Sequence, residues 1–246
     1  MKIGGTMLAH NAVRYDYCLE IALRSALPHV HRFVVLEADS DDGTMELLRT
    51  LQREFAHLEV IHGAWKTSRE GFWLADLSNV ARATLTDCDW QFSLQADEVL
   101  EHGFAPEFFT GKGVSFQRLN FWLTDSLVTP PTKICGSLVR RLAPQSIAFI
   151  GDAEQIGWEP TPIVSTPRIF HYGFLRKPGP FVEKSKPMHI AYTGGYNPAL
   201  DEISETSTVG WEKCCRRDEC IPFTGAHPEI AHGWLRERGY LQSSAL

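Results

Sequence analysis

The sequence lacks any apolar run of the length that a membrane-spanning helix needs, about 20 residues. Its first residues, MKIGGTMLAHN, contain one Lys and no long apolar stretch, so they do not have the pattern of a signal peptide. These two absences favour a cytoplasmic protein. Peripheral association with a membrane stays open.

The six cysteines lack the C-x₂₋₄-C spacing that is usual in structural zinc sites. Cys18, Cys88 and Cys135 are dispersed among apolar neighbours, as buried free thiols usually are. The other three lie between residues 214 and 220. Because no export signal is visible, we expect reduced thiols and no structural disulfide.

A basic excess is also missing. The 246 residues include 24 Lys and Arg against 30 Asp and Glu, which gives a formal net charge of −6. This balance argues against a general nucleic-acid-binding surface, although a local basic groove remains open. The sequence has no internal repeat and no low-complexity tract. Its 43% of hydrophobic residues are enough for one ordinary core.

The first hundred residues alternate between strand and helix patterns. Strands are predicted at residues 2–9, 32–38, 58–63 and 89–100, where apolar and β-branched side chains gather. Helices are predicted at 15–27, 40–55 and 69–87, where apolar residues recur at helical spacing. This order predicts an α/β fold with a mostly parallel sheet and right-handed crossovers.

The second half has a different pattern. Strands are predicted at residues 113–125, 133–143 and 166–176, and a short terminal helix near 228–239. Pro-bearing segments at 131–134 and 159–167 are expected to be loops. The remaining residues of the last seventy are polar, aromatic and Pro-rich. One domain with an elaborated C-terminal part is the simplest interpretation.

Polar side chains follow three of the predicted strands, in AHNAVRY (9–15), EADSDDGT (37–44) and QADEV (95–99). The carboxyl ends of parallel strands meet at one edge of a sheet, where ligands of α/β proteins bind. Carboxylate oxygens there suit a divalent cation that neutralises a diphosphate. Each acidic segment also has an ordinary interpretation: SDDGT as a turn with a helix cap, and ADEVL as an exposed loop.

These segments occur in order with GDAEQIGWE (151–159), IFHYGFLRK (169–177) and TGAHPEI (224–230), and together they resemble the motifs of family 2 glycosyltransferases. The resemblance implies a GT-A fold, with a Rossmann-like, mostly parallel central sheet flanked by helices. It implies a nucleotide-sugar-binding core at 1–175. A C-terminal extension at 176–246 would pack on that core.

The resemblance also implies roles for individual residues. Asp97 and His171 match the residues that bind Mn²⁺ or Mg²⁺. Glu154 matches a candidate general base, with Asp152 as the second choice. The donor-binding residues expected from the same motifs and their flanks are His10, Asn11, Glu37, Asp42, Asn79, Gln95 and Arg176.

Three positions need comment. Gln95 stands where the family has the first Asp of its metal motif, and Glu37 is one methylene longer than the usual Asp. Glu98 has no clear role: it could orient a loop, contact the acceptor or support a metal ligand. Arg176 lies just beyond His171 and could bind phosphate, or it could belong to a solvated basic turn.

The expected activity is therefore metal-dependent transfer of a sugar from a nucleotide-diphosphate donor, UDP or GDP, to an acceptor hydroxyl, with inversion. The acceptor (a glycan, glycolipid, protein or modified nucleic-acid base) is not readable. Gln95 keeps open a catalytically degenerate GT-A domain that binds a sugar or a partner. A nucleotidyltransferase is a further alternative, although AHNAVRY lacks the glycine run that a triphosphate loop usually has.

Overall fold

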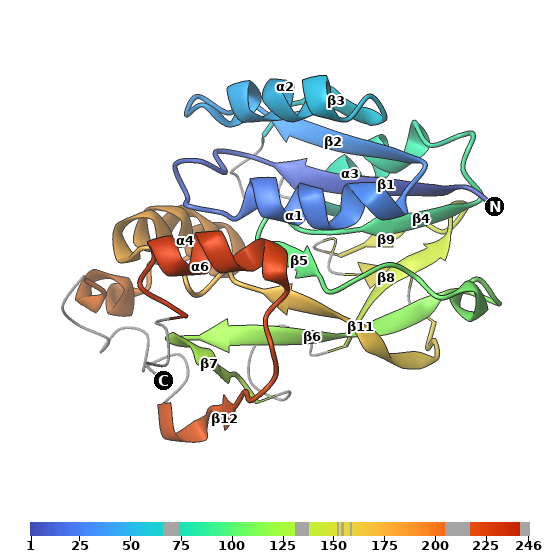
Figure 1. The fold of residues 1–246 in the computed structure, drawn as a ribbon. Coiled ribbons are helices and arrows are strands. Elements are labelled where there is room, and N and C mark those ends of the chain that lie inside the picture. Colours follow the sequence, from blue (N-terminus) through green and yellow to red (C-terminus); the bar gives the residue numbers. More distant parts are fainter. Residues whose placement is uncertain are drawn as a thin grey trace.

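In the computed structural model, helices cover both faces of one central sheet (Figure 1). The structure describes residues 1–65, 74–130, 138–151, 153, 155–157, 159–204 and 217–241. The layers of helix, sheet and helix confirm the α/β class that the alternating strand and helix patterns predict.

Four parallel strands form the N-terminal half of the sheet, in the order β3-β2-β1-β4. They are β1 (Ile3–Ala9), β2 (Arg32–Ala38), β3 (Leu58–Gly63) and β4 (Trp90–Ser93). The chain runs outward from β1 to β3 and then returns to place β4 on the other side of β1. This reversal is a topological switch point, and ligands of α/β sheets bind outside the carboxyl ends of strands there.

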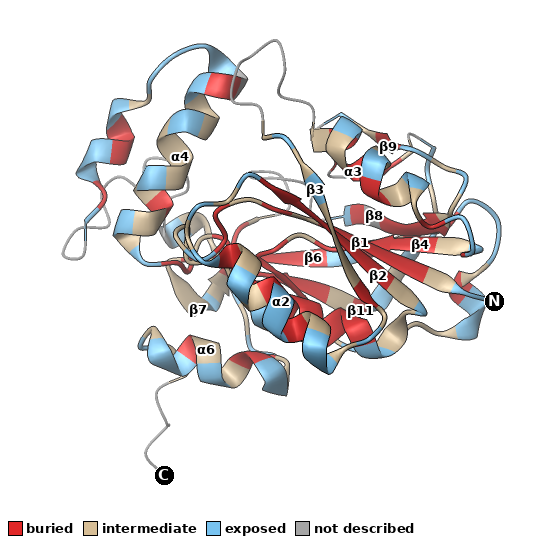
Figure 2. Ribbon diagram, turned by 90° about the horizontal axis from the view of Figure 1, so that it is seen from above, coloured by how far each residue is buried: buried red, intermediate tan, exposed pale blue. Residues whose placement is uncertain are grey.

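The helices that flank these strands are α1 (Leu19–Ala26), α2 (Thr44–Glu54) and α3 (Leu74–Ala83). Side chains of a strand alternate between its two faces, and both faces of β2 are covered. Phe33 and Val35 pack in the cluster that includes α1 and α2, whereas Val34 and Leu36 pack against α3. An unbroken apolar run therefore fits β2, which is buried along its length (Figure 2).

The C-terminal half of the sheet is mixed. Its strands are β5 (Glu98–Leu100), β6 (Val114–Trp122), β7 (Thr124–Val128), β8 (Leu138–Pro144), β11 (Ile163–His171) and β12 (Ile221–Pro222). β8 runs antiparallel to β4 and β6, while β11 runs parallel to β6 and antiparallel to β5. A short pair, β9 (Phe149–Ile150) and β10 (Gln155–Ile156), lies apart from the sheet of ten strands.

The predicted mostly parallel sheet therefore describes its first half better than its second. A single residue, Leu123 at φ 63°, joins β6 to β7. So short a connection permits only antiparallel pairing, because parallel neighbours need a crossover of about a dozen residues or more. A parallel half joined to a mixed half, with helices on both faces, is consistent with the predicted GT-A-like fold.

Helix α4 (Pro178–Thr193) lies in a region that the sequence did not mark as helical. Its prolines argue against a helix, but Pro178 and Pro180 occupy the first turn, where a missing N–H costs nothing. The helix ends at Gly194, whose φ of 74° is the left-handed conformation that suits glycine. Sequence reasoning missed this helix because its start consists of residues that usually mark loops.

A second correction concerns the segment 159–167, which was expected to be a loop. Strand β11 begins within it, at Ile163, and pairs with β6. The register shifts between Val164 and Ile169, so the Pro-containing part of the segment lies at an irregularity of the strand. Proline has no backbone N–H, and an irregularity of this kind tolerates the missing hydrogen bond.

The C-terminal residues fold back onto the first half of the chain. Helix α6 (His232–Glu237), with the short helix η5 (Glu229–Ala231) before it, confirms the predicted terminal helix. Ala231 and Leu235 are buried in the same cluster as Cys18 and Val99. The remaining short helices are η1 (Leu27–His29), η2 (Pro106–Phe108), η3 (Pro198–Glu202) and η4 (Arg217–Glu219).

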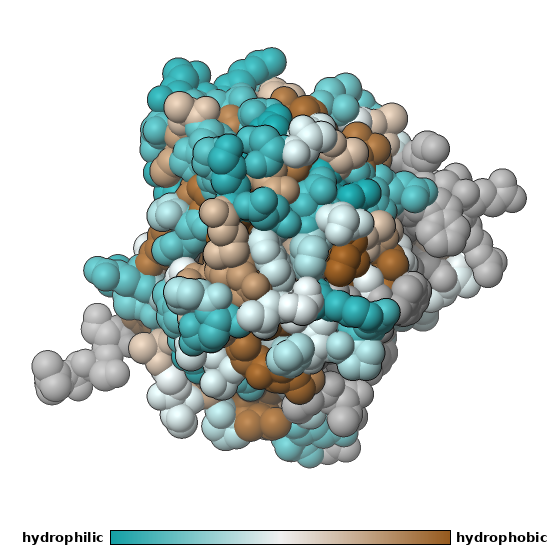
Figure 3. All heavy atoms as spheres, turned by 90° about the vertical axis from the view of Figure 1, so that its right-hand side faces the viewer, coloured by the Kyte–Doolittle hydropathy of each residue, from teal (hydrophilic) through white to brown (hydrophobic). Residues whose placement is uncertain are grey.

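The surface at the end of the sheet where the parallel strands begin is mixed in character (Figure 3). Hydrophobic residues form separate groups among hydrophilic ones there. Scattered apolar side chains are ordinary on protein surfaces. Among the described residues, no helix is long and apolar enough to cross a membrane.

A buried carboxylate links three strands of the mixed half to the loop after β4. Glu98, the first residue of β5, is fully buried, and its Oε1 accepts hydrogen bonds from Arg118 of β6 (3.0 Å) and Arg141 of β8 (2.9 Å). Its Oε2 accepts the backbone N–H of Gln95 (2.9 Å). Both arginines are almost fully buried as well. Buried charges of this kind are tolerated only when they have partners.

We expect Glu98→Ala to lower the free energy of unfolding by about 3–5 kcal/mol, because it leaves two buried guanidinium groups without this carboxylate. Urea denaturation at neutral pH measures the change. Glu59→Ala is the control, since it removes a 44% exposed carboxylate that pairs with Arg32, and it should cost no more than about 1 kcal/mol. Equal losses in both variants would contradict the prediction.

Candidate functional site

A cavity of about 420 Å³ lies outside the carboxyl ends of β1 and β4, at the switch point of the sheet. The loops after these strands form one side of it, and α4 forms another. Its lining includes these residues with polar, charged or aromatic side chains, together with one glycine: His10, Tyr15, Tyr17, Trp65, Gln95, Asp97, His171, Gly173, Arg176 and Lys184. The structure therefore brings together residues from the first, fourth and eleventh strands.

Asp97 and His171 meet in this cavity because β5 pairs with β11. Asp97 comes just before β5, His171 ends β11, and the Tyr172 N–H donates to the Asp97 carbonyl (2.9 Å). His171 Nε2 lies 3.5 Å from Asp97 Oδ2. A Cβ atom on Gly173 would lie 2.6 Å from both of these atoms, so only glycine leaves the pair accessible.

The charge of Asp97 is set by its neighbours. Burial by itself would raise the pKa of this carboxyl, but its interaction with His171 and the charges of Arg176 and Lys184 bring that pKa well below its usual range. Asp97 is therefore a carboxylate at neutral pH. It is 8% exposed, so its interactions are weakly screened by solvent.

The Asp97–His171 pair offers one hard oxygen and one imidazole nitrogen to a cation. The described residues contain no group of three or more His, Cys, Asp or Glu side chains that could hold a metal by themselves. His171 Nδ1 is buried without a hydrogen-bond partner, which leaves the orientation of the ring unpinned on that side. This donor set fits a cation that takes its remaining ligands from water and an anionic ligand, as Mg²⁺ and Mn²⁺ commonly do.

The side chains of the adjacent acids Asp97 and Glu98 point in different directions. Asp97 faces the cavity, while Glu98 points into the interior toward Arg118 and Arg141. Gln95 lines the cavity, and its backbone N–H donates to Glu98. Of the roles left open for Glu98, this geometry corresponds to orienting the loop that carries Asp97.

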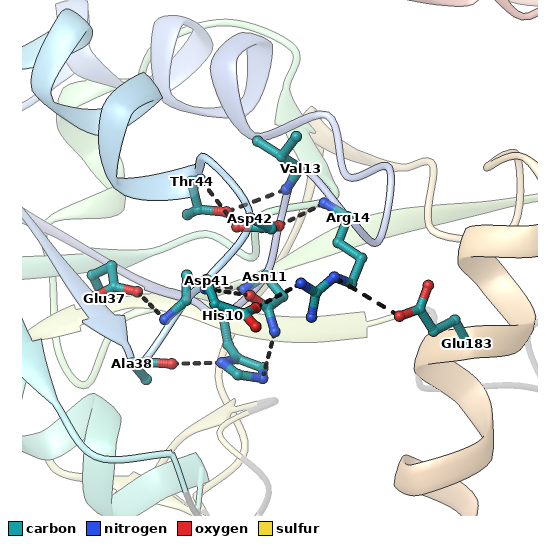
Figure 4. Close-up of polar contacts among 11 residues, drawn as sticks. His10, Asn11, Val13, Arg14, Glu37, Ala38, Asp41, Asp42, Thr44 and Glu183 are labelled. Carbon is teal, nitrogen blue, oxygen red and sulfur yellow. Dashed lines mark hydrogen bonds and ion pairs between the residues drawn. The ribbon is translucent and has the colours of Figure 1, made fainter.

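The loop after β1 is held by the loop after β2 (Figure 4). His10 lines the cavity, its Nδ1 donates to the Ala38 carbonyl, and its ring stacks on Trp65 at 4.3 Å and 6°. Asn11 adopts φ 47°, and its Oδ1 accepts the N–H of Asp41 (3.0 Å). The stacked His10–Trp65 pair gives the cavity an aromatic surface, which suits a planar ring.

Four predicted donor-binding residues, Asn11, Glu37, Asp42 and Asn79, lie outside the cavity lining. Glu37 accepts the Ser40 N–H (2.6 Å), and Asp42 accepts the Arg14 N–H (2.6 Å), so both shape the loops in Figure 4. Asn79 exchanges two hydrogen bonds with the backbone of Phe149, at 2.9 and 3.1 Å. Their roles toward a donor stay predictions.

The two candidates for the general base, Glu154 and Asp152, lie outside the described residues. The residue between them, Ala153, lines the cavity and has φ 64°. Its carbonyl accepts a hydrogen bond from Arg141 Nη1 (3.0 Å). The assignment of a base to this segment therefore stays a prediction.

Arg176 brings a fixed positive charge to the cavity wall. It is 4% exposed, and it donates to the carbonyls of Gly173 (2.6 Å) and Tyr15 (3.2 Å). The rings of Tyr17 and Phe181 flank its guanidinium at 4.7 and 5.2 Å. This is a buried and oriented cation, not a solvated basic turn.

Sequence reasoning missed several lining residues, including Tyr15, Tyr17, Trp65 and Lys184. Tyr15 and Tyr17 were assigned to a helix, but α1 begins only at Leu19, so they belong to the loop after β1. Lys184 lies on α4, which was not predicted from the sequence because the helix contains several prolines. A Trp two residues after the end of β3, at position 65, was a usable signal, because ligands bind beyond the carboxyl ends of the strands of such a sheet.

Asp16 ties together three segments around the cavity. It sits between Tyr15 and Tyr17 at φ 53°, and its carboxylate accepts the Lys177 N–H (2.9 Å). It also forms an ion pair with Arg238 just after α6. The C-terminal helix thereby holds the loop that supplies two rings to the cavity.

Comparison with known proteins gives distant likenesses. No protein-family model and no curated protein sequence matches this chain. A crystal structure of a S. aureus TarS fragment in complex with UDP resembles it at 12% identity and a TM-score of 0.46, over 78% of this chain and 65% of that one. The chain thus spans slightly less than two thirds of that fragment.

The galactosyltransferase LgtC, in complex with donor and acceptor sugar analogs, resembles the chain at 16% identity and a TM-score of 0.30. This likeness covers 49% of this chain and 47% of LgtC. At such identities and TM-scores, neither likeness identifies a substrate or the role of a residue.

We expect Asp16→Asn to lower the free energy of unfolding by about 1–3 kcal/mol, because Arg238 loses its buried charged partner and keeps the exposed Glu237. Asparagine tolerates positive φ, so the substitution removes charge without straining the backbone. Urea denaturation followed by tryptophan fluorescence measures the loss. Asp89→Asn, which removes a 62% exposed carboxylate at the start of β4, is the control. Equal stability of the two variants would disprove the role given to Asp16.

Proposed function

We propose that this chain is a glycosyltransferase that transfers a sugar from a nucleotide-diphosphate donor to an acceptor hydroxyl. The observation that carries the proposal is the composition of the cavity at the switch point. The Asp97–His171 pair, the cations Arg176 and Lys184 and the stacked His10–Trp65 rings line the same space. A nucleoside diphosphate has a planar base and a polyanion that match these features.

In the proposed reaction, the bond between the anomeric carbon and the phosphate oxygen breaks. Its electron pair stays on the oxygen, so the leaving nucleotide gains one negative charge. The acceptor oxygen forms the new bond to the anomeric carbon, and its proton passes to a base. Arg176 is fixed in advance near that developing charge, and such preorganised cations stabilise a transition state without reorganisation.

Asp97 and His171 would hold Mn²⁺ or Mg²⁺ in this proposal. When bound, the cation would supply Lewis-acid stabilisation of the charge on the phosphates. The chain itself keeps Asp97 ionised and places His171 beside it. Gly173 keeps the pair open to the ligand.

Glu154, with Asp152 as the alternative, is the proposed general base. Support comes from Ala153, which lies between them and lines the cavity. A carboxylate on the far side of the sugar from the leaving group predicts inversion at the anomeric carbon. The donor would be UDP- or GDP-linked, and the acceptor class stays open.

The competing proposal is a non-catalytic GT-A domain that binds a sugar nucleotide or a partner. Gln95 favours it, because an amide lining the cavity at this position brings no negative charge to the cation. The two proposals differ in turnover. Slow hydrolysis of a bound UDP- or GDP-sugar that requires Asp97 would support the enzyme.

The test is calorimetric titration with UDP, GDP and CMP, each with and without MnCl₂. We expect one nucleotide to bind in a Mn²⁺-dependent manner, and Asp97→Asn to weaken it at least about tenfold, a loss of about 1.4 kcal/mol. The reason is that the variant loses the charged oxygen that would bind the cation.

Asp89→Asn is the matched control, because it removes one carboxylate from the opposite end of β4 and should bind as the wild type does. If the wild-type protein binds none of the three nucleotides under either condition, the donor site is wrong. If Asp97→Asn binds the nucleotide as tightly as the wild type does, the proposed metal site is wrong.

A further inference from the structure

Helix α4 presents one face to the cavity. The lining residues that it contributes are Lys184, Pro187, Met188 and Ala191. Their spacing of three, four and seven residues from Lys184 places all of them on one side of the helix. Three of the four are apolar, so Lys184 carries the only charge that this lining face brings to the cavity.

The other charged side chains nearby on α4 have partners elsewhere. Glu183 lies 3.8 Å from Arg14, across the gap between α4 and the loop after β1 (Figure 4). Lys186 forms an ion pair with Asp201 (2.8 Å), away from the cavity. Among the described residues, Lys184 forms no ion pair or hydrogen bond, and its ammonium lies 5.9 Å from the centre of the Tyr17 ring.

Two cations therefore share one aromatic ring. The guanidinium of Arg176 lies 4.7 Å from the Tyr17 ring, and the ammonium of Lys184 lies on the same ring. Among the described residues, the cavity lining offers these two cations one carboxylate, Asp97, so positive charge is in excess at the half-buried Tyr17 ring. A ligand with several negative charges supplies the missing counter-charge, whereas a neutral or singly charged ligand gains less.

The two cations differ in how many hydrogen-bond donors remain available to a ligand. Arg176 already donates to the Gly173 and Tyr15 carbonyls and is packed between two rings. The ammonium of Lys184 keeps its donors available, on a flexible stem that can follow the ligand. Arg176 supplies a fixed charge, and Lys184 supplies the adaptable hydrogen bonds.

We propose that Lys184 of α4 binds the diphosphate of the donor and of the leaving nucleotide, from the side of the cavity opposite the strand ends. The proposal rests on the proposed function and adds α4 to the donor site. Its chemistry is a charge-assisted hydrogen bond to a phosphate oxygen. The same contact would hold the additional negative charge that the leaving nucleotide gains.

The test compares Lys184→Met, which removes the charge but keeps most of the length, with Lys184→Arg, which keeps the charge. We titrate each with UDP and GDP in MnCl₂, and with uridine and guanosine by NMR. Lys184→Met should weaken diphosphate binding about tenfold or more and leave nucleoside binding unchanged, because only the phosphates contact the ammonium. Lys184→Arg should stay within about threefold of the wild type.

Lys186→Met is the matched control, since it removes a lysine of the same helix that pairs with Asp201 outside the cavity. It should bind as the wild type does, and thermal unfolding should show all three variants folded. Added NaCl should weaken the wild type more than Lys184→Met.

The outcomes separate the two proposals. If the wild type binds a nucleoside diphosphate and Lys184→Met binds it equally well, the role of Lys184 is wrong and the proposed function stands. An equal loss of nucleoside and diphosphate binding would show that Lys184 shapes the cavity without contacting phosphate, which also overturns the inference. If the wild type binds no nucleotide, the proposed function itself fails.

Discussion

The buried carboxylate of Glu98 constrains the site more than any other single group. One oxygen holds Arg118 and Arg141 on two strands of the mixed half of the sheet, and the other holds the backbone of Gln95. An ion in the interior keeps its charge only while its partners stay in place. The turn from Gln95 to Glu98 therefore has little freedom, and Asp97 is left facing the cavity.

The site lies where the two halves of the sheet meet, and each half contributes different chemistry. The parallel half ends in His10 and Gln95, and the mixed half delivers His171 through the pairing of β5 with β11. Helix α4 then closes the cavity with a mostly apolar face. Neither half contains the site alone, so the order of the strands decides which residues can meet.

Much of this was predictable from the sequence. Alternating strand and helix patterns predicted the first half of the fold, and acids after strands predicted the edge where the cavity lies. Helix α4 was not predictable from pattern, because Pro178, Pro180 and Pro187 are residues that usually interrupt helices. The separate directions of Asp97 and Glu98 were not predicted, because Asp97 lies in the turn before β5 and the alternation of side chains along a strand does not apply to it. Which of the two faces the ligand depends on the distant arginines.

The ion pair of Asp16 with Arg238 joins residues 222 positions apart. A ribosome makes the chain from its N-terminus, and folding of the earlier part begins while the later part is still missing. The strands of the parallel half can pair early, but the loop with Tyr15 and Tyr17 gains this ion pair only after Arg238 has emerged. The cavity therefore gains this ion pair only when the last described helix has been made, long after the four parallel strands beside which the cavity lies.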